Sequence, residues 1–263
     1  MKVTALQFLR RRTVKIATWN VNGIRARQQQ LLDWIGRDRP EIVCLQEIKA
    51  SVDQVPPLLC NMPEYWCYWH GERAYSGVAM LVHRDICAEQ PQFSHPDFDN
   101  ENRIVTARVC NMLVGSVYVP NGGKDFQAKL RFLEAMERYV RECHASGLDL
   151  ILCGDMNVTR TDQDVHPKER RPNAIGQLPQ ERELFEGILR EGMTDVGRSL
   201  DPNNEELFTW WPPWRNMRQR NIGWRIDYLL ASQSLSSRIT HSSVLVDVGT
   251  SDHAPVTAVV SSQ

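Results

Sequence analysis

The sequence has no long hydrophobic run, and this absence excludes a class of protein. No apolar segment approaches the roughly 18 residues that a bilayer-spanning helix needs, so we expect no membrane partner. A short apolar stretch at residues 3–9 precedes the arginines at 10–12. A secretory signal peptide has the opposite order, with its charges first. The N-terminus therefore predicts no export.

The sequence also lacks paired metal-binding or disulfide motifs. Its seven cysteines are scattered without a Cys-x-x-Cys spacing, and Cys44, Cys110 and Cys153 stand inside apolar runs. This usage is typical of a reducing compartment, and it disfavours a disulfide framework or a zinc site. We therefore expect a cytoplasmic protein.

Neither sign of charge dominates the chain. The formal net charge is -1 at pH 7. This value neither favours nor excludes a polyanionic partner, because an acidic centre can cancel a basic rim in the sum. No internal repeat, low-complexity tract or linker divides the 263 residues. We therefore expect a short extension, residues 1–13, followed by one domain, residues 14–263.

Apolar runs typical of β-strands recur along the whole chain, with amphipathic helices between some of them. Continuous apolar strands mixed with hairpin-like neighbours indicate an α/β protein with a mixed sheet, or with two sheets packed face to face under outer helices. Two irregular segments, 160–179 and 200–223, exceed the usual length of a connection, which favours a functional role. The strand patterns occupy residues 14–19, 41–46, 77–82, 104–109, 113–119, 148–153, 225–230, 244–248 and 255–260, and the helical patterns 28–37, 125–144 and 180–190.

Polar side chains gather where five of the apolar runs begin or end. The most informative cluster is Asp252-His253 at the start of the last run, because it places a carboxylate beside an imidazole. Of the seven histidines, His253 alone follows an aspartate and precedes an apolar run. Turn formation or helix capping explains any one cluster, but five along one chain indicate a shared site. The other four are Asn20-Val21-Asn22, Gln46-Glu47, Asp155-Met156-Asn157 and Arg225-Ile226-Asp227.

These side chains offer oxygen atoms to a cation. Carboxylates and amides suit Mg²⁺ or Mn²⁺, whereas zinc prefers cysteine and histidine, whose characteristic spacings are absent. Carboxylates brought close together would repel one another unless a divalent ion or a protonated His253 offset their charge. The clusters therefore predict an oxygen-lined metal centre with a histidine beside it.

A second signal is the interleaving of aromatic and basic residues. The stretch Phe208-Thr209-Trp210-Trp211-Pro212-Pro213-Trp214 is followed by three arginines and by Trp224. Arginines neutralise phosphates, and flat rings stack on an exposed sugar or base. Three tryptophans within five positions cannot all point inward, so we expect at least one exposed ring and a nucleic-acid surface. For Trp210 and Trp224, a core role and a binding role remain equally open.

With these motifs in this order, the chain resembles the exonuclease III family of apurinic/apyrimidinic (AP) endonucleases, within the endonuclease/exonuclease/phosphatase superfamily. The resemblance extends over residues 14–260 and implies a four-layer fold, two mixed β-sheets flanked by helices. Its most discriminating element is residues 221–228, which relatives acting on phosphoinositides or sphingomyelin are not expected to carry. The other matching segments are residues 18–26, 45–49, 118–122, 154–157 and 251–255.

The resemblance implies a metal centre. Glu47 would be the principal ligand, assisted by Asn20 and Asp252, and the cofactor would be Mg²⁺, for which Mn²⁺ can substitute. Asn22 stands where some members of the family have an aspartate. One carboxylate fewer makes a site for two metal ions less secure.

The resemblance also implies catalytic roles. Asp155 would position or deprotonate the attacking water, and Asn157 would orient it. His253, held by Asp227, would contact the scissile phosphate and stabilise its charge. Tyr118 would complete the phosphate pocket. Hydrolysis of a phosphodiester needs such groups, because an in-line water and donors around the phosphate lower its barrier.

A further set of residues is expected to contact the substrate. Trp224, Ile226 and either Phe208 or Trp210 would line a pocket for the extruded abasic sugar. Other members would contact the phosphate or enter the duplex, as some relatives do with a wedge in the region of Trp214. The whole set is Asn22, Asn121, Lys124, Phe208, Trp210, Trp214, Trp224 and Ile226.

Together these features predict a Mg²⁺-dependent AP endonuclease of base-excision repair, which cuts duplex DNA 5′ to an abasic site and leaves a 3′-hydroxyl. We expect accompanying 3′→5′ exonuclease and 3′-phosphatase or 3′-repair activity, because all need the same hydrolysis. The expected partner is duplex DNA with abasic sites or blocked 3′ ends, bound by a cytoplasmic, nucleoid-associated monomer. Two alternatives stay open: a phosphatase of small or lipid phosphates, and a catalytically silent DNA-binding protein.

Overall fold

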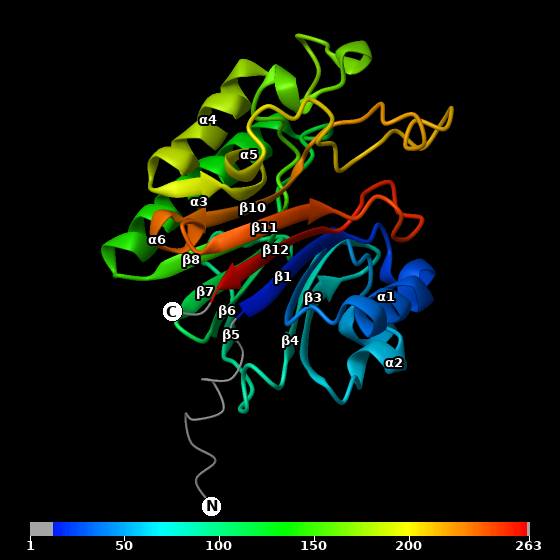
Figure 1. Ribbon diagram of the computed structural model, residues 1–263, viewed down its shortest axis with the longest axis vertical. Helices are drawn as coiled ribbons and strands as arrows, with labels where there is room; N and C mark the ends of the chain where they lie inside the picture. Colours follow the sequence, from blue (N-terminus) through cyan, green and yellow to red (C-terminus); the bar gives the residue numbers. More distant parts are fainter. Residues whose placement is uncertain (1–12, 262–263) are drawn as a thin grey trace, which may run out of the picture.

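Two six-stranded β-sheets packed face to face form the centre of the molecule, and helices cover their outer faces (Figure 1). This computed structural model describes residues 13–261. Residues 1–12 of the expected extension lie outside the described part, and residue 13 already belongs to the first strand. The predicted four-layer α/β sandwich is confirmed. In the part of the chain that is described, no helix combines the length and hydrophobicity needed to cross a membrane.

The two sheets repeat one strand order. Each contains a single parallel pair joined by a helical crossover, β1 with β2 and β7 with β8, and its other pairs are antiparallel. The first sheet runs β11 (Ile239–Val244), β12 (Val256–Ser261), β1 (Thr13–Asn20), β2 (Ile42–Gln46), β4 (Tyr75–His83), β3 (Tyr65–Glu72). The second runs β5 (Phe93–Ser94), β6 (Ile104–Val109), β7 (Met112–Tyr118), β8 (Asp149–Asp155), β10 (Asp227–Ser232), β9 (Met193–Asp195).

The helices cover the outer faces of the two sheets. α1 (Ile24–Asp38) and α2 (Pro57–Cys60) pack on the first sheet, while α3 (Phe126–Ala145) and α4 (Pro179–Arg190) pack on the second (Figure 1). Shorter helical segments complete the chain: α5 (Val196–Leu200), α6 (Gln233–Ser236), η2 (Val52–Gln54), η3 (Asp162–Asp164) and η4 (Pro167–Glu169). The three long helices lie where the amphipathic patterns predicted them.

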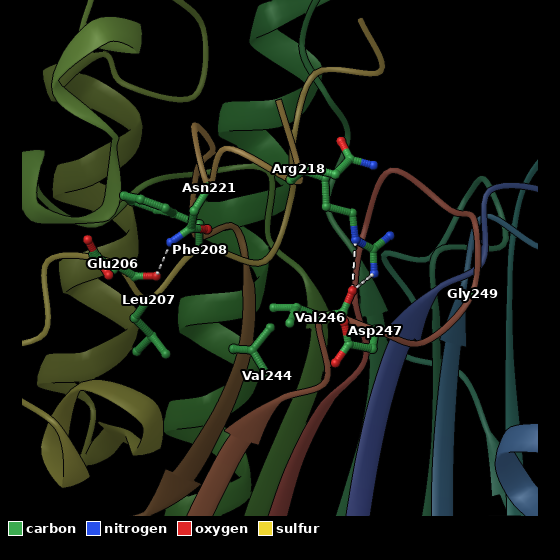
Figure 2. Close-up of a pocket in the computed structure, with 10 residues that line it drawn as sticks. Glu206, Leu207, Phe208, Arg218, Asn221, Val244, Val246, Asp247 and Gly249 are labelled. Carbon is green, nitrogen blue, oxygen red and sulfur yellow. Dashed lines mark hydrogen bonds between the residues drawn. The ribbon is translucent and has the colours of Figure 1, made fainter. Parts of the chain in front are cut away.

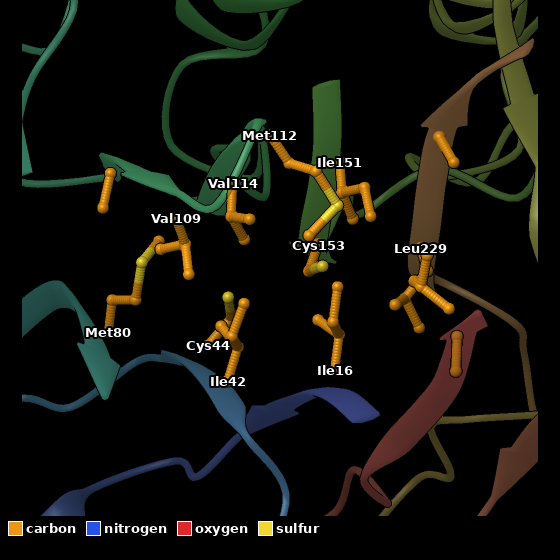
Figure 3. Close-up of a cluster of buried hydrophobic side chains, with 14 of the residues drawn as sticks. Ile16, Ile42, Cys44, Met80, Val109, Met112, Val114, Ile151, Cys153 and Leu229 are labelled. Carbon is orange, nitrogen blue, oxygen red and sulfur yellow. The ribbon is translucent and has the colours of Figure 1, made fainter. Parts of the chain in front are cut away.

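The core lies between the sheets, and strand periodicity builds it. Successive side chains of a strand point to opposite faces. In β2, Ile42 and Cys44 therefore face the second sheet, while Val43 and Leu45 face α1 and α2. Figure 3 shows this inner layer, in which side chains of β1, β2 and β4 meet those of β6, β7, β8 and β10. Because both faces of the central strands are buried, their sequences read as continuous apolar runs.

One predicted strand is wrong, and the edge strands β3, β5 and β9 were not predicted. The apolar run at residues 244–248 is not a strand: β11 ends at Val244, and a turn follows in which Val248 N donates to Leu245 O at 3.0 Å. The true strand contains Thr240 to Ser243, whose polar side chains suit an edge position. β3 was not predicted, because its aromatic sequence shows no alternation of polar and apolar residues.

Candidate active site

Two parallel strand pairs bring the predicted residues to one end of the sandwich. Asn20, Tyr118 and Asp155 all stand at the carboxyl ends of strands, and the antiparallel β10 and β12 begin at the same edge. The Asn20 amide nitrogen joins the sheets, because it donates to Asp155 Oδ2 at 2.9 Å and to Glu47 Oε1 at 3.2 Å. Its oxygen accepts from Asn22 N at 3.0 Å, so its role as a metal ligand stays a prediction.

The backbone is strained around this end of the sandwich. Asn22, Glu47, Lys49 and Asn157 have φ of 46°, 49°, 50° and 50°, a region that residues other than glycine seldom adopt. Strained residues of this kind cluster at functional sites, where the surrounding structure holds them in place. At Gly154, next to the predicted base, a Cβ would collide with the carbonyl oxygen of Val117.

Asp155 lies at the centre of the hydrogen-bond network. Its Oδ1 accepts from Asn157 N at 2.9 Å, and its Oδ2 accepts from Asn157 Nδ2 at 3.2 Å. Burial, opposed by the charge of His253 and reinforced by the nearby Asp227 and Glu47, raises the pKa of Asp155 to about 7. A carboxyl with this pKa can exchange a proton with water near neutral pH. This geometry suits the general base predicted from the sequence.

Asp227 and Thr209 hold His253 in place. The imidazole Nδ1 lies 2.8 Å from Asp227 Oδ2, and Thr209 Oγ1 donates to the same oxygen at 2.6 Å. Burial would lower the pKa of His253, but Asp227 outweighs it and raises the pKa to about 10. The imidazole is therefore protonated at neutral pH. Its Nε2 lies 3.9 Å from Asp155 Oδ2, beyond hydrogen-bond distance, so this proton can be donated to a substrate.

The principal expected metal ligand, Glu47, contacts a lysine cation in this structure. Lys49 Nζ lies 2.7 Å from Glu47 Oε2 and 2.6 Å from Asn22 Oδ1. Burial raises the pKa of Glu47, but hydrogen bonds and charge from Lys49 and Tyr118 outweigh it and lower the pKa. Asn22 Nδ2 also donates to Asp252 Oδ1 at 2.8 Å. Carboxylate and amide oxygens that already stabilise positive charge fit a divalent cation of the magnesium type.

Tyr118 connects this acidic group to a buried arginine. Its hydroxyl donates to Glu47 Oε1 at 2.7 Å, and the Arg103 guanidinium lies 4.8 Å above its ring. Burial, and then Glu47 and Asp155, raise the pKa of Tyr118, so the phenol stays protonated. Sequence reasoning missed Arg103, and it identified Lys49 only as part of a motif.

The predicted aromatic pocket lies next to His253. Trp210 and Trp224 contact edge to face with ring centroids 5.4 Å apart, and Trp210 lies 6.4 Å from the His253 ring. Trp210 Nε1 donates to Asp252 Oδ2 at 3.0 Å. Ile226 is buried behind them. Trp210 thus contacts Trp224, His253 and Asp252, and a binding role for the two tryptophans stays a prediction.

Other predicted substrate residues stand apart from the catalytic groups. Trp214 is 57% exposed, whereas Trp211 and Phe208 are buried in a small cluster beneath it. The expectation of an exposed tryptophan is thus confirmed, at Trp214. Lys124 Nζ lies 5.2 Å from the centre of the Tyr75 ring. Asn121 is closer to the site, because its amide donates to Asn157 Oδ1 at 3.2 Å.

A surface pocket of about 610 Å³ lies beside the site but contains none of the predicted catalytic groups (Figure 2). Phe208 lines it together with Val244 and Asp247. Arg218 donates there to Val246 O at 3.1 and 2.7 Å, and to Ser251 O at 2.6 Å. This arginine anchors the 200–223 segment to the segment that carries Asp252, rather than facing solvent as a phosphate-binding cation would.

Two buried ionic groups brace the site; sequence reasoning missed Lys129, and it identified Arg225 only as part of a motif. Lys129 of α3 is completely buried, pairs with Glu181 of α4 and donates to Asn157 O at 2.7 Å. Arg225 forms a bidentate pair with Asp195 at 2.8 and 2.6 Å. No local pattern identifies such residues, because their partners lie 30 or more positions away. A lysine or arginine embedded in an otherwise apolar face is the only signal.

The chain is similar to known proteins in both sequence and structure. Residues 17–253 match the Endonuclease/Exonuclease/phosphatase family. Over 254 residues the chain is 36% identical to the DNA repair nuclease APEX1 of Danio rerio, covering 93% of this chain and 81% of that protein. A 3′-5′ exonuclease (NExo) of Neisseria meningitidis superimposes with a TM-score of 0.86 at 31% identity, covering 93% and 98%. An AP endonuclease of Archaeoglobus fulgidus superimposes with 0.85 at 29% identity, covering 94% and 99%.

Proposed function

This protein belongs to the endonuclease/exonuclease/phosphatase family and is a phosphodiester hydrolase of the DNA-repair nuclease type, and we propose that it cuts duplex DNA 5′ to an abasic site and leaves a 3′-hydroxyl. One observation carries the proposal: a buried acid–histidine centre lies directly beside an edge-to-face tryptophan pair. The hydrolytic groups alone suit any phosphate ester. The rings select a substrate that offers an exposed sugar or base.

The catalytic residues divide the work of hydrolysis. Asp155 accepts the proton of the attacking water, in keeping with its pKa of about 7. Asn157 holds the carboxylate in position through its backbone and side-chain nitrogens. Protonated His253 donates from Nε2 to a phosphate oxygen and so stabilises the charge that develops there. Tyr118, at the end of β7, holds Glu47 through its phenol and would complete the phosphate pocket.

The metal in this proposal is Mg²⁺, with Mn²⁺ as a substitute. Glu47 would hold it, with Asn20 and Asp252 as further ligands, and the bound ion would supply charge stabilisation to the phosphate and leaving oxygen. The Lys49 ammonium occupies the space between Glu47 and Asn22 in this structure. We expect it to move toward solvent when the ion binds.

An abasic nucleotide suits the aromatic pocket because little stacking is lost when it leaves the helix. Trp210 and Trp224 would enclose the bare sugar against Ile226, and a nucleotide with its base would need more room. The Trp214 side chain, which is 57% exposed, would insert into the duplex. Lys124 and Asn121 would contact the backbone phosphates.

The same centre would process 3′ ends. Removal of a terminal nucleotide and removal of a 3′-phosphate both need hydrolysis of a phosphate held between Asp155 and His253. We therefore include 3′→5′ exonuclease and 3′-phosphatase activity in the proposal. We also propose that the protein acts as a monomer in the cytoplasm, where a reducing environment suits its seven unpaired cysteines.

A single-turnover cleavage assay tests the function. A labelled duplex with one tetrahydrofuran abasic analogue should be cut 5′ to the analogue in Mg²⁺ and remain intact in EDTA. Glu47→Ala should lose at least about 100-fold in rate, more than loss of an outer-shell partner costs, and should need more metal. The matched control is Glu134→Ala on the exposed face of α3. An uncut duplex with rapid hydrolysis of free phosphoinositides would instead support the phosphatase alternative.

A further inference from the structure

A second group of metal-ligating side chains lies away from the catalytic residues. His70 belongs to β3, the edge strand of the first sheet, and His95 follows β5, the edge strand of the second. Asp99 stands in the loop after His95. Within residues 13–261, these three side chains are the one group of histidine, cysteine or acidic residues found with ligand atoms within 4.8 Å of one another. The group thus joins the edges of the two sheets.

The spacing of the three ligand atoms suits a tetrahedral metal ion. Asp99 Oδ2 lies 2.8 Å from His70 Nε2 and 3.9 Å from His95 Nδ1. Zinc bonds of about 2.0–2.1 Å place neighbouring ligand atoms roughly 3.3 Å apart in a tetrahedron, and the two observed distances bracket this value. Each imidazole has a nitrogen within 4 Å of Asp99 Oδ2. The two rings stack with centroids 3.7 Å apart, so one ring must turn to bring both nitrogens onto one ion.

Second-shell hydrogen bonds hold the ligands in place. Asp99 Oδ1 accepts from Arg103 N at 2.8 Å, which leaves Oδ2 for an ion. Tyr68 Oη lies 2.8 Å from His95 Nε2. With an ion on Nδ1, the His95 proton resides on Nε2 and is donated to this phenol, the outer-shell support that metal-bound histidines usually have. His95 Nδ1 is also 3.0 Å from Ile104 O, and an ion would replace that contact.

We propose that His70, His95 and Asp99 form a Zn²⁺ site that clamps the two sheets together at their edges. Two imidazoles and one carboxylate are a donor set of zinc and related transition metals, whereas Mg²⁺ prefers six oxygens. The Asp99 side chain is completely buried, while His70 and His95 are 21% and 27% exposed. An ion can therefore enter from solvent, and water can complete its coordination. Sequence spacing disfavoured zinc because the chain has no paired cysteine or His-x₃-His motif, whereas this group combines His95 and Asp99, four positions apart, with the distant His70.

The clamp is connected to the active site by one residue. Arg103 donates its backbone nitrogen to Asp99, accepts from Tyr118 N at 2.7 Å and lays its guanidinium over the Tyr118 ring. Tyr118 in turn donates to Glu47. Zn²⁺ on Asp99 would therefore fix the segment that positions Tyr118. The proposal does not depend on which DNA lesion the enzyme cuts.

Cobalt titration of the whole protein tests the site. The protein is first saturated with Mg²⁺, and Co²⁺ is then added while the visible absorption of tetrahedral Co²⁺ is recorded. We expect saturation at one equivalent per chain and displacement by Zn²⁺. His70→Gln and His95→Gln should each weaken Co²⁺ binding at least about tenfold. The matched control His241→Gln, at an exposed position of β11, should bind like the parent.

Two further measurements keep the outcome unambiguous. Glu47→Gln should retain the Co²⁺ signal, because it alters the catalytic centre only. Zn²⁺ should raise the Tm of the parent and of His241→Gln, but not that of His70→Gln, with folding checked by circular dichroism. Absence of saturable absorption, a signal that survives in both His70→Gln and His95→Gln, or a signal lost in Glu47→Gln would overturn the proposal. The three side chains would then be a hydrogen-bonded group without a metal.

Discussion

The buried pair between Lys129 and Glu181 provides a quantitative test of how the outer layer supports the site. Lys129 Nζ contacts Glu181 and donates to Asn157 O, while Glu181 Oε1 accepts from the backbone nitrogens of Gly176 and Leu178. Burial lowers the pKa of Lys129, opposed by the charge of Glu181. Lys129→Met removes the cation but keeps most of the side-chain volume. It leaves a buried carboxylate and one unpaired carbonyl.

The magnitude follows from the burial of both partners. Removal of one partner of a buried ion pair costs about 3–5 kcal/mol, because the other charge stays desolvated. For a protein of this size, each kcal/mol lowers Tm by about 2–4 °C. Lys129→Met should therefore lower Tm by roughly 6–20 °C, and Glu181→Gln should do the same. The double variant should cost about 2 kcal/mol less than the sum of the two, because no lone charge remains.

Differential scanning calorimetry on the parent, the two single variants and the double variant measures this coupling. Arg141→Met is the matched control, since Arg141 lies on the same helix and forms an exposed ion pair with Glu191, and its Tm should stay close to that of the parent. Lys129→Met, alone or combined with Glu181→Gln, should also cut abasic DNA more slowly, because Asn157 O loses its hydrogen bond from Lys129. The reasoning is refuted if Lys129→Met shifts Tm no more than Arg141→Met, or if the two single losses simply add.

Three further predictions use other features. Gly154→Ala should lower the free energy of unfolding by at least about 2 kcal/mol, because its Cβ would collide with the backbone. Gly36→Ala has open space around its Cβ and should raise it by about 0.5–1 kcal/mol. Chemical denaturation of both variants and the parent measures these changes. Trp214→Ala should keep the parental Tm but weaken binding to abasic duplex at least about fivefold, and equal affinity in a fluorescence titration would contradict its contact with DNA. The pKa of His253 is raised from 6.5 to about 10 in the folded protein. In EDTA, the protonated imidazole therefore adds to the free energy of unfolding below pH 6.5, and this contribution is lost as the pH rises toward 10. Asp227→Asn should flatten this part of the stability profile, and an unchanged profile would show that the pair is not its source.

The sequence predicted the fold and the convergence of the candidate site residues, because both depend on local patterns. Apolar runs located the central strands, and polar residues at their ends located Asn20, Glu47 and Asp155. These groups converge because parallel strands end at the same edge of a sheet. The prediction failed where an element is defined by its position at an edge. β11 is an example, since its polar residues face solvent and its apolar neighbours pack in a turn.

The supporting residues could not be predicted from local patterns. Lys129 and Glu181 lie 52 positions apart in the chain, and each alone reads as an ordinary helix residue. No local pattern in the sequence identifies Arg103 either, although its guanidinium packs on the Tyr118 ring. His70 belongs to β3, whereas His95 and Asp99 share the loop between β5 and β6. Their meeting depends on how the two sheets pack, which is a property of the whole fold.

The place of β12 in the first sheet has a consequence for protein synthesis. This strand, Val256–Ser261, hydrogen-bonds between β1, near the beginning of the chain, and β11. During translation, β1 can pair early with β2. More than 200 further residues must be synthesised before β12, its other neighbour, leaves the ribosome. Asp252 and His253 immediately precede that last strand. A nascent chain that has not yet reached residue 252 thus lacks both Asp252 and His253, and it leaves one edge of β1 unpaired.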